Sequence, residues 1–486
     1  MPSKIRLFTV LSGGSAGTRS SRVRSCLIAF AFCASLGAAG SEGGSGAGAK
    51  SAESGPEKGA AESSPAEKSE QPPSEENTEW WNGDYALTGW NGARARLAQR
   101  GVYFEFRYSG ELRSNTSGGI NTDDSTHYLG NVNASVDLFT DKLKLYDGGE
   151  FYLRFENVHG QGISQHQTGD IQLLSSIDAP AFNQISELFY RHSILDDRLH
   201  FKIGKQDGSG DFIAPKYGID FTHSAFGCIS NIPLPRFSIY APAAVISFDA
   251  YKWMTFAAGV YDGDFQRHAL GLEHPFQGSF HDFTIAEFLF KPELIKDHET
   301  IIRAGAWHQR ADLPLIGALN TDGTADLRTR FKQNDGAYLE YEQSVYHRPA
   351  PKDGEKKDDD PQAKARKELV APGTPEPLDQ GLAVFAQLSY EPDNRNDQPR
   401  YFGGGVFYKG LFKGRDDDRL GVGVASVGFS QRLHPDHKTY EAAIETFYKI
   451  QTTPFSSFQP DLQYILHPGG FRPNATTVGF RYQISF

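Results

Sequence analysis

The segment TTVGFRYQISF, residues Thr476–Phe486, alternates strictly between two kinds of side chain. One set is apolar or aromatic: Val478, Phe480, Tyr482, Ile484 and Phe486. The other set is polar or small: Thr477, Gly479, Arg481, Gln483 and Ser485. Successive strand side chains point to opposite faces, so this segment predicts a β-strand with one apolar and one polar face. A soluble sandwich would turn the apolar face inward, whereas a membrane barrel would turn it toward lipid.

The composition favours a protein of many strands and turns. The chain has 486 residues, of which 13% are aromatic and 51 are Gly, with only 2 Met. The formal net charge of −11 argues against a nucleic-acid partner, which normally requires a clustered basic surface. No segment approaches the roughly 20 apolar residues of a membrane helix. A transmembrane barrel would pass this test too, because only every second strand residue faces lipid.

The N-terminus has the features of an export signal over residues 1–39. A positive region with Arg19, Arg22 and Arg24 precedes the short apolar core CLIAFAFCASLG and a run of small residues. We therefore expect this segment to be cleaved. Two of the three cysteines lie inside it, so the mature chain would keep only Cys228 and no internal disulfide.

Two further segments lack apolar periodicity. Residues 40–79 are rich in Gly, Ser, Pro and Glu, and we expect a disordered linker because they cannot bury enough apolar surface to fold. Residues 347–380 contain EKKDDDPQAKARKE, which is typical of a solvated charged insert.

From residue 80 onward the hydrophobic pattern has a period of two. Val102, Phe104, Phe106 and Tyr108 alternate with polar residues, and similar runs follow along the chain. The polar faces carry Glu, Arg, Lys, Asp and Asn in one run after another. Counting these runs predicts about sixteen strands, an even number as in bacterial single-chain barrels.

The lengths of the connections separate the barrel from the sandwich. Short turns such as ILDD and AYKW alternate with four long connections: 159–183, 207–236, 263–282 and 309–335. Outer-membrane barrels have short turns at one end and long loops at the other. With a periplasmic N-terminus, all four long connections would be extracellular. The sequence thus predicts an all-β transmembrane antiparallel barrel over residues 80–486, preceded by a disordered N-terminal linker.

Several ordered motifs resemble the carbohydrate-selective porin family of OprB-like outer-membrane proteins. LTGWNGARARLA at residues 87–98 is similar to the opening of that family, with Asn91 where the family often has Gly. DDRLHFKIGKQDGSGDF, GVYDGD and the closing PDLQYILHPGG and NATTVGFRYQISF match further along the chain. The resemblance implies a monomeric sixteen-stranded barrel in the outer membrane of a diderm bacterium. It also implies passive diffusion of mono- and small oligosaccharides, and a C-terminal Phe486 read by the outer-membrane assembly machinery.

Polar side chains on the inward faces are the candidates for substrate binding. Guanidinium and carboxylate groups bind sugar hydroxyls, and an indole offers a stacking face. The pore-lining candidates are Glu105, Arg107, Arg154, Glu156, Lys202, Arg303, Trp307, Glu441, Glu445 and Arg481. The alternative for each residue is that it is merely hydrated in the lumen, or that it forms an ion pair with another residue of the barrel wall.

The connection 207–236 is the candidate for a constriction loop inside the lumen. It mixes aromatic residues with Asp207, Asp211, Lys216 and Arg236, as suits a loop packed in a wet barrel, although a surface cap has a similar composition. A non-selective general porin, a barrel enzyme and an adhesin remain the alternatives. No Ser, His and Asp spacing stands out as a catalytic triad, and we expect no enzyme activity, no cofactor and no metal site.

Overall fold

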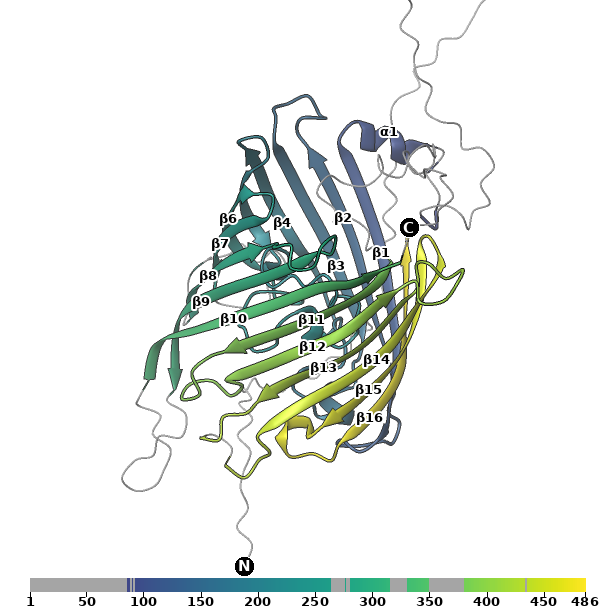
Figure 1. Cartoon of the computed structure of the whole chain (residues 1–486), viewed down its shortest axis with the longest axis vertical. Helices are drawn as coiled ribbons and strands as arrows, with labels where there is room; N and C mark the ends of the chain where they lie inside the picture. The colour runs from purple at the N-terminus through teal and green to yellow at the C-terminus, as the bar shows by residue number, and fades with distance from the viewer. Residues whose placement is uncertain are drawn as a thin grey trace, which may run out of the picture. The chain divides into compact units, whose positions relative to one another are not determined.

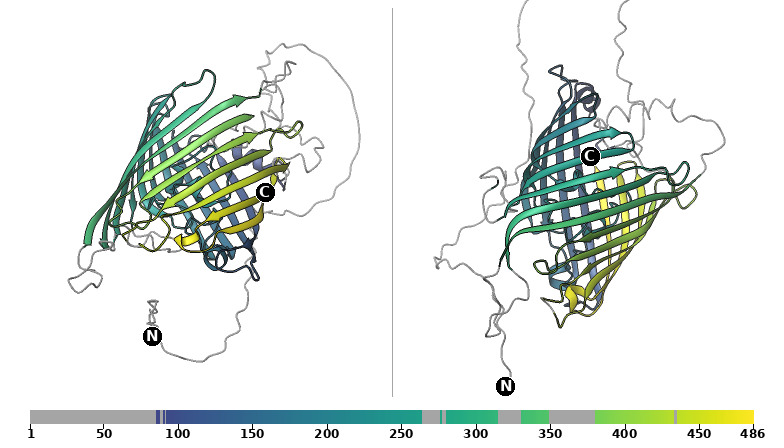
Figure 2. Two further views of the ribbon diagram at one scale, coloured as in Figure 1. Left: turned by 60° about the horizontal axis from the view of Figure 1, so that its bottom comes forward. Right: turned by 60° about the vertical axis from the view of Figure 1, so that its left-hand side comes forward.

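The described residues form one closed antiparallel barrel of sixteen strands (Figures 1 and 2). The computed structural model describes residues 85–87, 90, 92–263, 276, 280–314, 330–348, 380–432 and 435–486. Each strand pairs with its neighbours in sequence, and β1 pairs with β16 to close the wall. The predicted fold is therefore confirmed. The predicted signal, the predicted linker and residues 349–379 of the predicted insert lie outside the described residues.

The strands vary in length from eight to eighteen residues. They are β1 (Val102–Ser117), β2 (Thr126–Phe139), β3 (Gly149–Gly160), β4 (Phe182–Ile194), β5 (Leu199–Gln206), β6 (Ala241–Tyr251), β7 (Met254–Asp262), β8 (Phe280–Phe290), β9 (Thr300–Pro314), β10 (Arg330–His347), β11 (Gly381–Tyr390), β12 (Arg400–Lys409), β13 (Arg419–Gly428), β14 (Tyr440–Thr453), β15 (Ser456–Leu466) and β16 (Ala475–Ser485). The predicted long connection 309–335 is too long, because β9 and β10 pair as far as Pro314 and Arg330.

Short helical segments accompany the strands. They are α1 (Ala93–Gln99), α2 (Ser224–Gly227) and the single turns Ser164–Thr168, Gly208–Gly210 and Pro468–Gly470. Among the residues that the structure describes, no helix has the length and apolar character needed to cross a membrane.

The start and the end of the barrel meet at one end of the wall. The guanidinium of Arg94 in α1 donates to the backbone oxygens of Phe486 (2.8 Å) and Phe104. The backbone N–H of Phe486 donates to the oxygen of Phe106 at 2.8 Å. We call this end, which also carries the turns after the even-numbered strands, the terminal end. The opposite end is the loop end.

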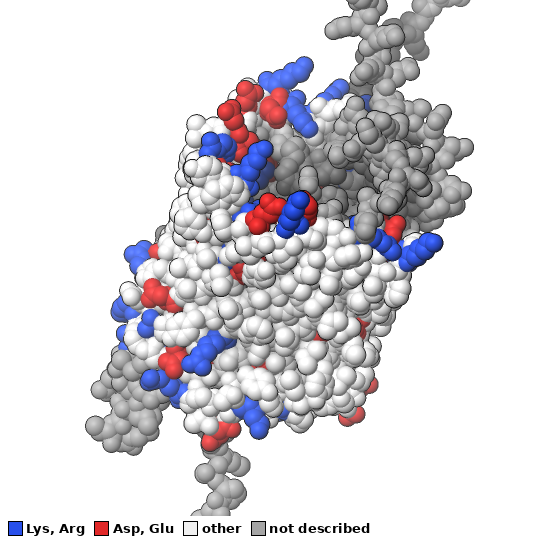
Figure 3. All heavy atoms as spheres, in the orientation of Figure 1, with Lys and Arg blue, Asp and Glu red and all other residues white. Residues whose placement is uncertain are grey.

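The apolar face of the last strand points out of the barrel. Val478, Phe480 and Tyr482 expose 43%, 37% and 37% of their surface, whereas Arg481 between them faces inward and exposes 6%. Large apolar side chains are exposed along the outer faces of many other strands. In the view of Figure 3, charged side chains gather toward the two ends of the wall and leave its middle largely free of them. Such an apolar band fits a surface in contact with lipid.

Loop 207–240, which joins β5 to β6, fills one side of the lumen. Its aromatic rings pack on the inner wall, with ring centroids of Phe221 and Phe447 4.9 Å apart and those of Tyr217 and Phe407 5.6 Å apart. The inner face of β13 is glycine-rich where the loop rests on it. A Cβ at Gly423 would approach Phe221 and Phe226 to less than 3 Å, so this close packing requires the missing side chain. The inward-facing loop thus has its own apolar core against the wall.

Candidate functional site

Wall glutamates hold loop 207–240 in place through its backbone. Glu342 on β10 accepts the N–H groups of Lys216 at 2.7 Å and Tyr217 at 2.8 Å. Glu445 on β14 accepts those of Thr222 at 2.7 Å and His223 at 2.9 Å. Buried backbone donors need such acceptors, and a carboxylate can accept two at once. The loop is therefore tied to two strands far apart in the sequence.

Further carboxylates on the wall act in the same way. Glu287 accepts the N–H of Ile213 at 3.0 Å, and Glu187 accepts that of Asp207 at 2.9 Å. Loop 161–181, which joins β3 to β4, is held by Glu441, whose carboxylate lies 2.9 Å from the N–H of Ile171. Both loops are therefore held inside the lumen by hydrogen bonds from their backbone N–H groups to carboxylates of the wall.

A buried ion cluster fixes the middle of loop 207–240. Asp220 lies 2.7 Å from the guanidinium of Arg419 and 2.9 Å from the ammonium of Lys449. Burial alone would raise the pKa of Asp220, but attraction to Lys449 and Arg419 outweighs it and lowers the pKa to about 2. The carboxylate is therefore ionised at any ordinary pH.

A second cluster joins the two loops to the seam between β1 and β16. Arg113 donates to Thr222 Oγ1 at 2.9 Å and also binds Glu111 and Asp461. Arg481 lies 2.8 Å from Glu111 and donates to hydroxyls of loop 161–181. Each buried charge in this cluster thus has an opposite charge beside it, as burial requires.

The two loops separate two large cavities within the lumen, and a smaller cavity of about 330 Å³ lies between loop 207–240 and strands β10 and β11. The terminal-end cavity has a volume of about 550 Å³, and the loop-end cavity has a volume of about 1000 Å³. Among the described residues, Phe237 alone lines both cavities. In loop 161–181, Ile177 lines the terminal-end cavity and its neighbour Asp178 lines the loop-end cavity. The Phe237 ring thus lies at the waist between the cavities.

Five of the predicted pore-lining residues lie on β1, β3 and β5. Glu105 and Arg107 pair with each other, and each side chain is about half exposed (49%). Arg154 lies 3.0 Å from Glu187. Glu156 accepts from the hydroxyl of Tyr240 at 2.5 Å and from the amide of Asn131 at 2.9 Å. Lys202 donates to Asp211 at 2.8 Å.

The structure brings four of these residues and one further candidate to the terminal-end cavity. Glu105, Arg107, Arg154 and Glu156 line it, together with Arg481 from the opposite side of the seam. These groups come from strands at both ends of the sequence. The cavity wall therefore offers cationic and anionic groups side by side.

The other predicted pore-lining residues are covered by protein. Glu441 and Glu445 are buried beneath the loops that they anchor, and Arg303 is buried beside Glu342 (2.7 Å) and Glu340 (3.5 Å). Trp307 exposes 4% of its surface, with its indole stacked on Phe283 at 5.7 Å. In this arrangement the indole is not offered to the lumen.

The four predicted constriction-loop residues mostly stabilise the loop. Asp207 accepts the N–H of Ser209 at 2.9 Å, and Asp211 pairs with Lys202. Lys216 pairs with Glu299, and the guanidinium of Arg236 donates to the oxygens of Ile229 (2.9 Å) and Ser230 (3.1 Å). Among them, Asp207 and Arg236 also line a cavity.

Several important residues were absent from the sequence prediction. Phe237 and loop 161–181 form the waist, and Glu287 and Glu342 anchor the loop. Glu342 lies in the strand-like run GAYLEYEQS, but its sequence gives no sign of what the side chain binds. Phe237 carried no signal that distinguishes it from the other aromatic residues of its loop.

Comparison with known proteins agrees with this architecture. Residues 123–486 match the carbohydrate-selective porin, OprB family. Porin B of Pseudomonas aeruginosa is 22% identical over 457 residues, which cover 83% of this chain and 92% of that protein. A high-pH structure of OprB from Pseudomonas putida has a TM-score of 0.70 at 19% identity, covering 83% of this chain and 99% of that one. The low-pH structure of the same protein has a TM-score of 0.53 at 16% identity, with the same shares of both chains covered.

Proposed function

Because the chain belongs to the carbohydrate-selective porin, OprB family, an outer-membrane family, we propose that it lets neutral sugars diffuse passively through the lumen. Family and fold together indicate a channel rather than an enzyme. The observation that carries the proposal is the pair of cavities inside a closed barrel that both have Phe237 in their lining. The loop end faces the cell exterior in this proposal, and the terminal end faces the periplasm.

The terminal-end cavity supplies groups suited to a sugar. Arg107 and Arg154 donate, and Glu105 and Glu156 accept, without requiring charge on the ligand. Lys202, which pairs with Asp211, adds charge at the base of loop 207–240. Binding must be weak, because a channel has to release what it captures.

The buried candidates take a different role in this proposal. Arg303, Trp307, Glu441 and Glu445 shape the channel by holding the loops, while Asp207, Asp211, Lys216 and Arg236 keep loop 207–240 in the conformation that narrows the lumen. The barrel acts as a monomer. The chain is exported as a precursor whose first 39 residues are removed, and the outer-membrane assembly machinery recognises Phe486. A non-selective general porin is the second candidate, since alternating ion pairs also line pores without sugar preference.

Liposome swelling with sugars of graded size tests the proposal. The wild-type protein should admit monosaccharides faster than trisaccharides, and Phe237→Ala should raise the size limit because it removes the ring at the waist. Leu313→Ala, at a position that lines only the loop-end cavity, is the matched control and should leave the size limit unchanged. No swelling with any sugar would overturn the sugar channel. Equal rates for sugars and for ionic solutes of the same size would favour the general porin.

A further inference from the structure

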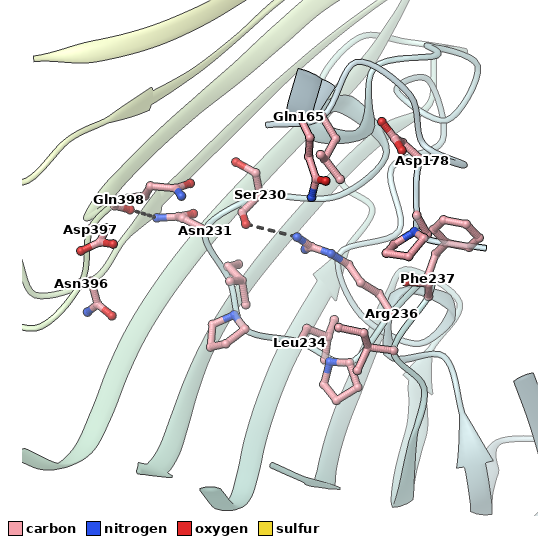
Figure 4. A pocket seen from close by; sticks show the side chains of 18 of the residues that line it. Gln165, Asp178, Ser230, Asn231, Leu234, Arg236, Phe237, Asn396, Asp397 and Gln398 are labelled. Carbon is pink, nitrogen blue, oxygen red and sulfur yellow. Dashed lines mark hydrogen bonds between the residues drawn. The ribbon is translucent and has the colours of Figure 1, made fainter. Parts of the chain in front are cut away.

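The loop-end cavity has two chemically different walls. Residues 232–235, with the sequence Ile-Pro-Leu-Pro, form an apolar strip together with Phe237 and Ile239. Amide side chains line other parts of the same cavity: Gln161, Gln165, Asn231, Gln309, Asn396 and Gln398. Charged side chains lie among them: Asp178, Arg236, Glu391, Arg395 and Asp397. Figure 4 shows Gln165 and Gln398 on opposite sides of the cavity, with Leu234 below them.

Part of the amide wall is held rigidly. Asn396 donates to the backbone oxygen of Pro392 at 2.9 Å and exchanges amide hydrogen bonds of 2.8 and 2.9 Å with Asn334. Asn231 donates to the backbone oxygen of Gln398 at 3.0 Å. A wall held in one geometry loses little conformational freedom when a ligand binds to it.

This combination matches a neutral saccharide. A pyranose ring has apolar C–H faces and a rim of hydroxyl groups, and a side-chain amide such as that of Gln165 or Gln398 can offer both a donor and an acceptor to those hydroxyls. The volume of about 1000 Å³ is nearly twice that of the terminal-end cavity, so it can hold more than one sugar unit. Phe237 lines both cavities and therefore lies between them.

We propose that the loop-end cavity is a capture site for a neutral oligosaccharide, bound between the apolar strip and the amides before it reaches Phe237. The proposal rests on the sugar-channel function and adds a second binding site in series. The terminal-end cavity, with its ion pairs, then takes one sugar unit at a time.

Block of single-channel current by maltotriose tests the capture site. Maltotriose is applied to each side of the bilayer in turn, and glucose serves as the small probe. We expect maltotriose to bind more tightly from one side, the side onto which the loop end opens, and glucose to show a smaller difference. The double variant Gln165→Leu with Gln398→Leu should weaken block from that stronger side by about fivefold or more, as expected for the loss of two neutral hydrogen bonds.

Asn121→Leu is the matched control, because Asn121 lies in an exposed loop outside both cavities and should leave block unchanged. The variants are scored only as open channels, so a barrel that fails to fold contributes no data. Asn133→Leu, at an amide of the terminal-end cavity, provides a second comparison that should spare the difference between the two sides.

Two results would overturn the capture site: equal maltotriose block from both sides of the wild-type channel, or unchanged block in the double glutamine variant. Liposome swelling would still report sugar flux in either case, so the channel function stands or falls separately.

Discussion

The lumenal wall differs greatly between its two halves. Along β9 to β14 it is covered by loop 207–240, and inward glutamates such as Glu342 and Glu445 are buried at 1% and 0% exposure. Along β1 and β3 the part near the terminal end faces open cavity, where Glu105 is half exposed, whereas Glu111 and Glu156 farther along these strands are buried at 2%. Both halves carry polar residues at alternate positions of their strands. An inward-facing charge can therefore serve either as an anchor for protein or as a contact for solute, depending on whether a loop lies above it.

The covered half should be the more sensitive to substitution, with Glu342→Ala showing the largest effect. The change leaves the N–H groups of Lys216 and Tyr217 without their acceptor and removes the nearest partner of Arg303. Breaking a buried pair in this way costs about 3 kcal/mol. We expect a higher single-channel conductance, because the loop leaves its position, and a lower temperature of unfolding on detergent gels.

Glu105→Ala is the matched change on the open half, and it should leave both quantities close to those of the wild type. Glu342→Gln keeps an acceptor oxygen and should have an intermediate effect. If Glu342→Ala and Glu105→Ala change the conductance and the temperature of unfolding equally, the covered half is no more important for stability than the open half.

The open half should control selectivity instead. Replacing Arg107 and Arg154 together by Ala removes two cations from the terminal-end cavity while Glu105 and Glu156 remain. The reversal potential in a salt gradient should move toward cation selectivity, and sugar block should weaken about fivefold, as for the loss of about 1 kcal/mol of hydrogen bonding. Arg310→Ala, at an exposed arginine on the outer face of β9, serves as the control. Unchanged reversal potential and block would make both arginines wall structure.

A change of pH should have a smaller effect on ion selectivity, and it should distinguish the loop carboxyls of Asp178 and Asp220. Burial, with repulsion from Asp170 and Glu111, raises the pKa of Asp178 to about 6. The fold therefore favours protonated Asp178, and stability from this group increases as the pH falls through 6 toward 4. Below pH 6 the loop-end cavity loses a negative charge, so cation selectivity should decrease modestly between pH 8 and pH 5.

Burial, with repulsion from Asp397, also raises the pKa of Glu391, which lines the same cavity, to about 8. Asp178→Asn should therefore remove the part of the change near pH 6 and leave the part near pH 8. Asp220, with a pKa of about 2, stays ionised over the same range; its contribution to stability is present above about pH 4 and is lost as the pH falls toward 2. If a selectivity step near pH 6 persists in Asp178→Asn, that step belongs to another group.

The sequence predicted the fold well because strand alternation is a local signal. Residues such as Val478 and Arg481 reveal their faces within a few positions, and connection lengths then give the barrel. The division of the lumen is not local, since Thr222 and Glu445 meet across 223 positions of sequence. The glycines of β13 were the one hint that something packs there, but a glycine-rich strand does not reveal its occupant. Trp307 shows the consequence, because an inward indole looked available to sugar and is instead covered.

The seam between β1 and β16 has a consequence for how the chain folds. Contacts across it, such as that between Glu111 and Arg481, join residues 370 positions apart. The wall cannot close until the last strand has arrived, and closing so large a ring carries a high entropic cost before any contact repays it. Until then the sheet presents two unpaired edges that can join to other chains. The chain is therefore most prone to aggregation before the barrel closes. Binding by chaperones during that interval then determines how much of the protein reaches the membrane.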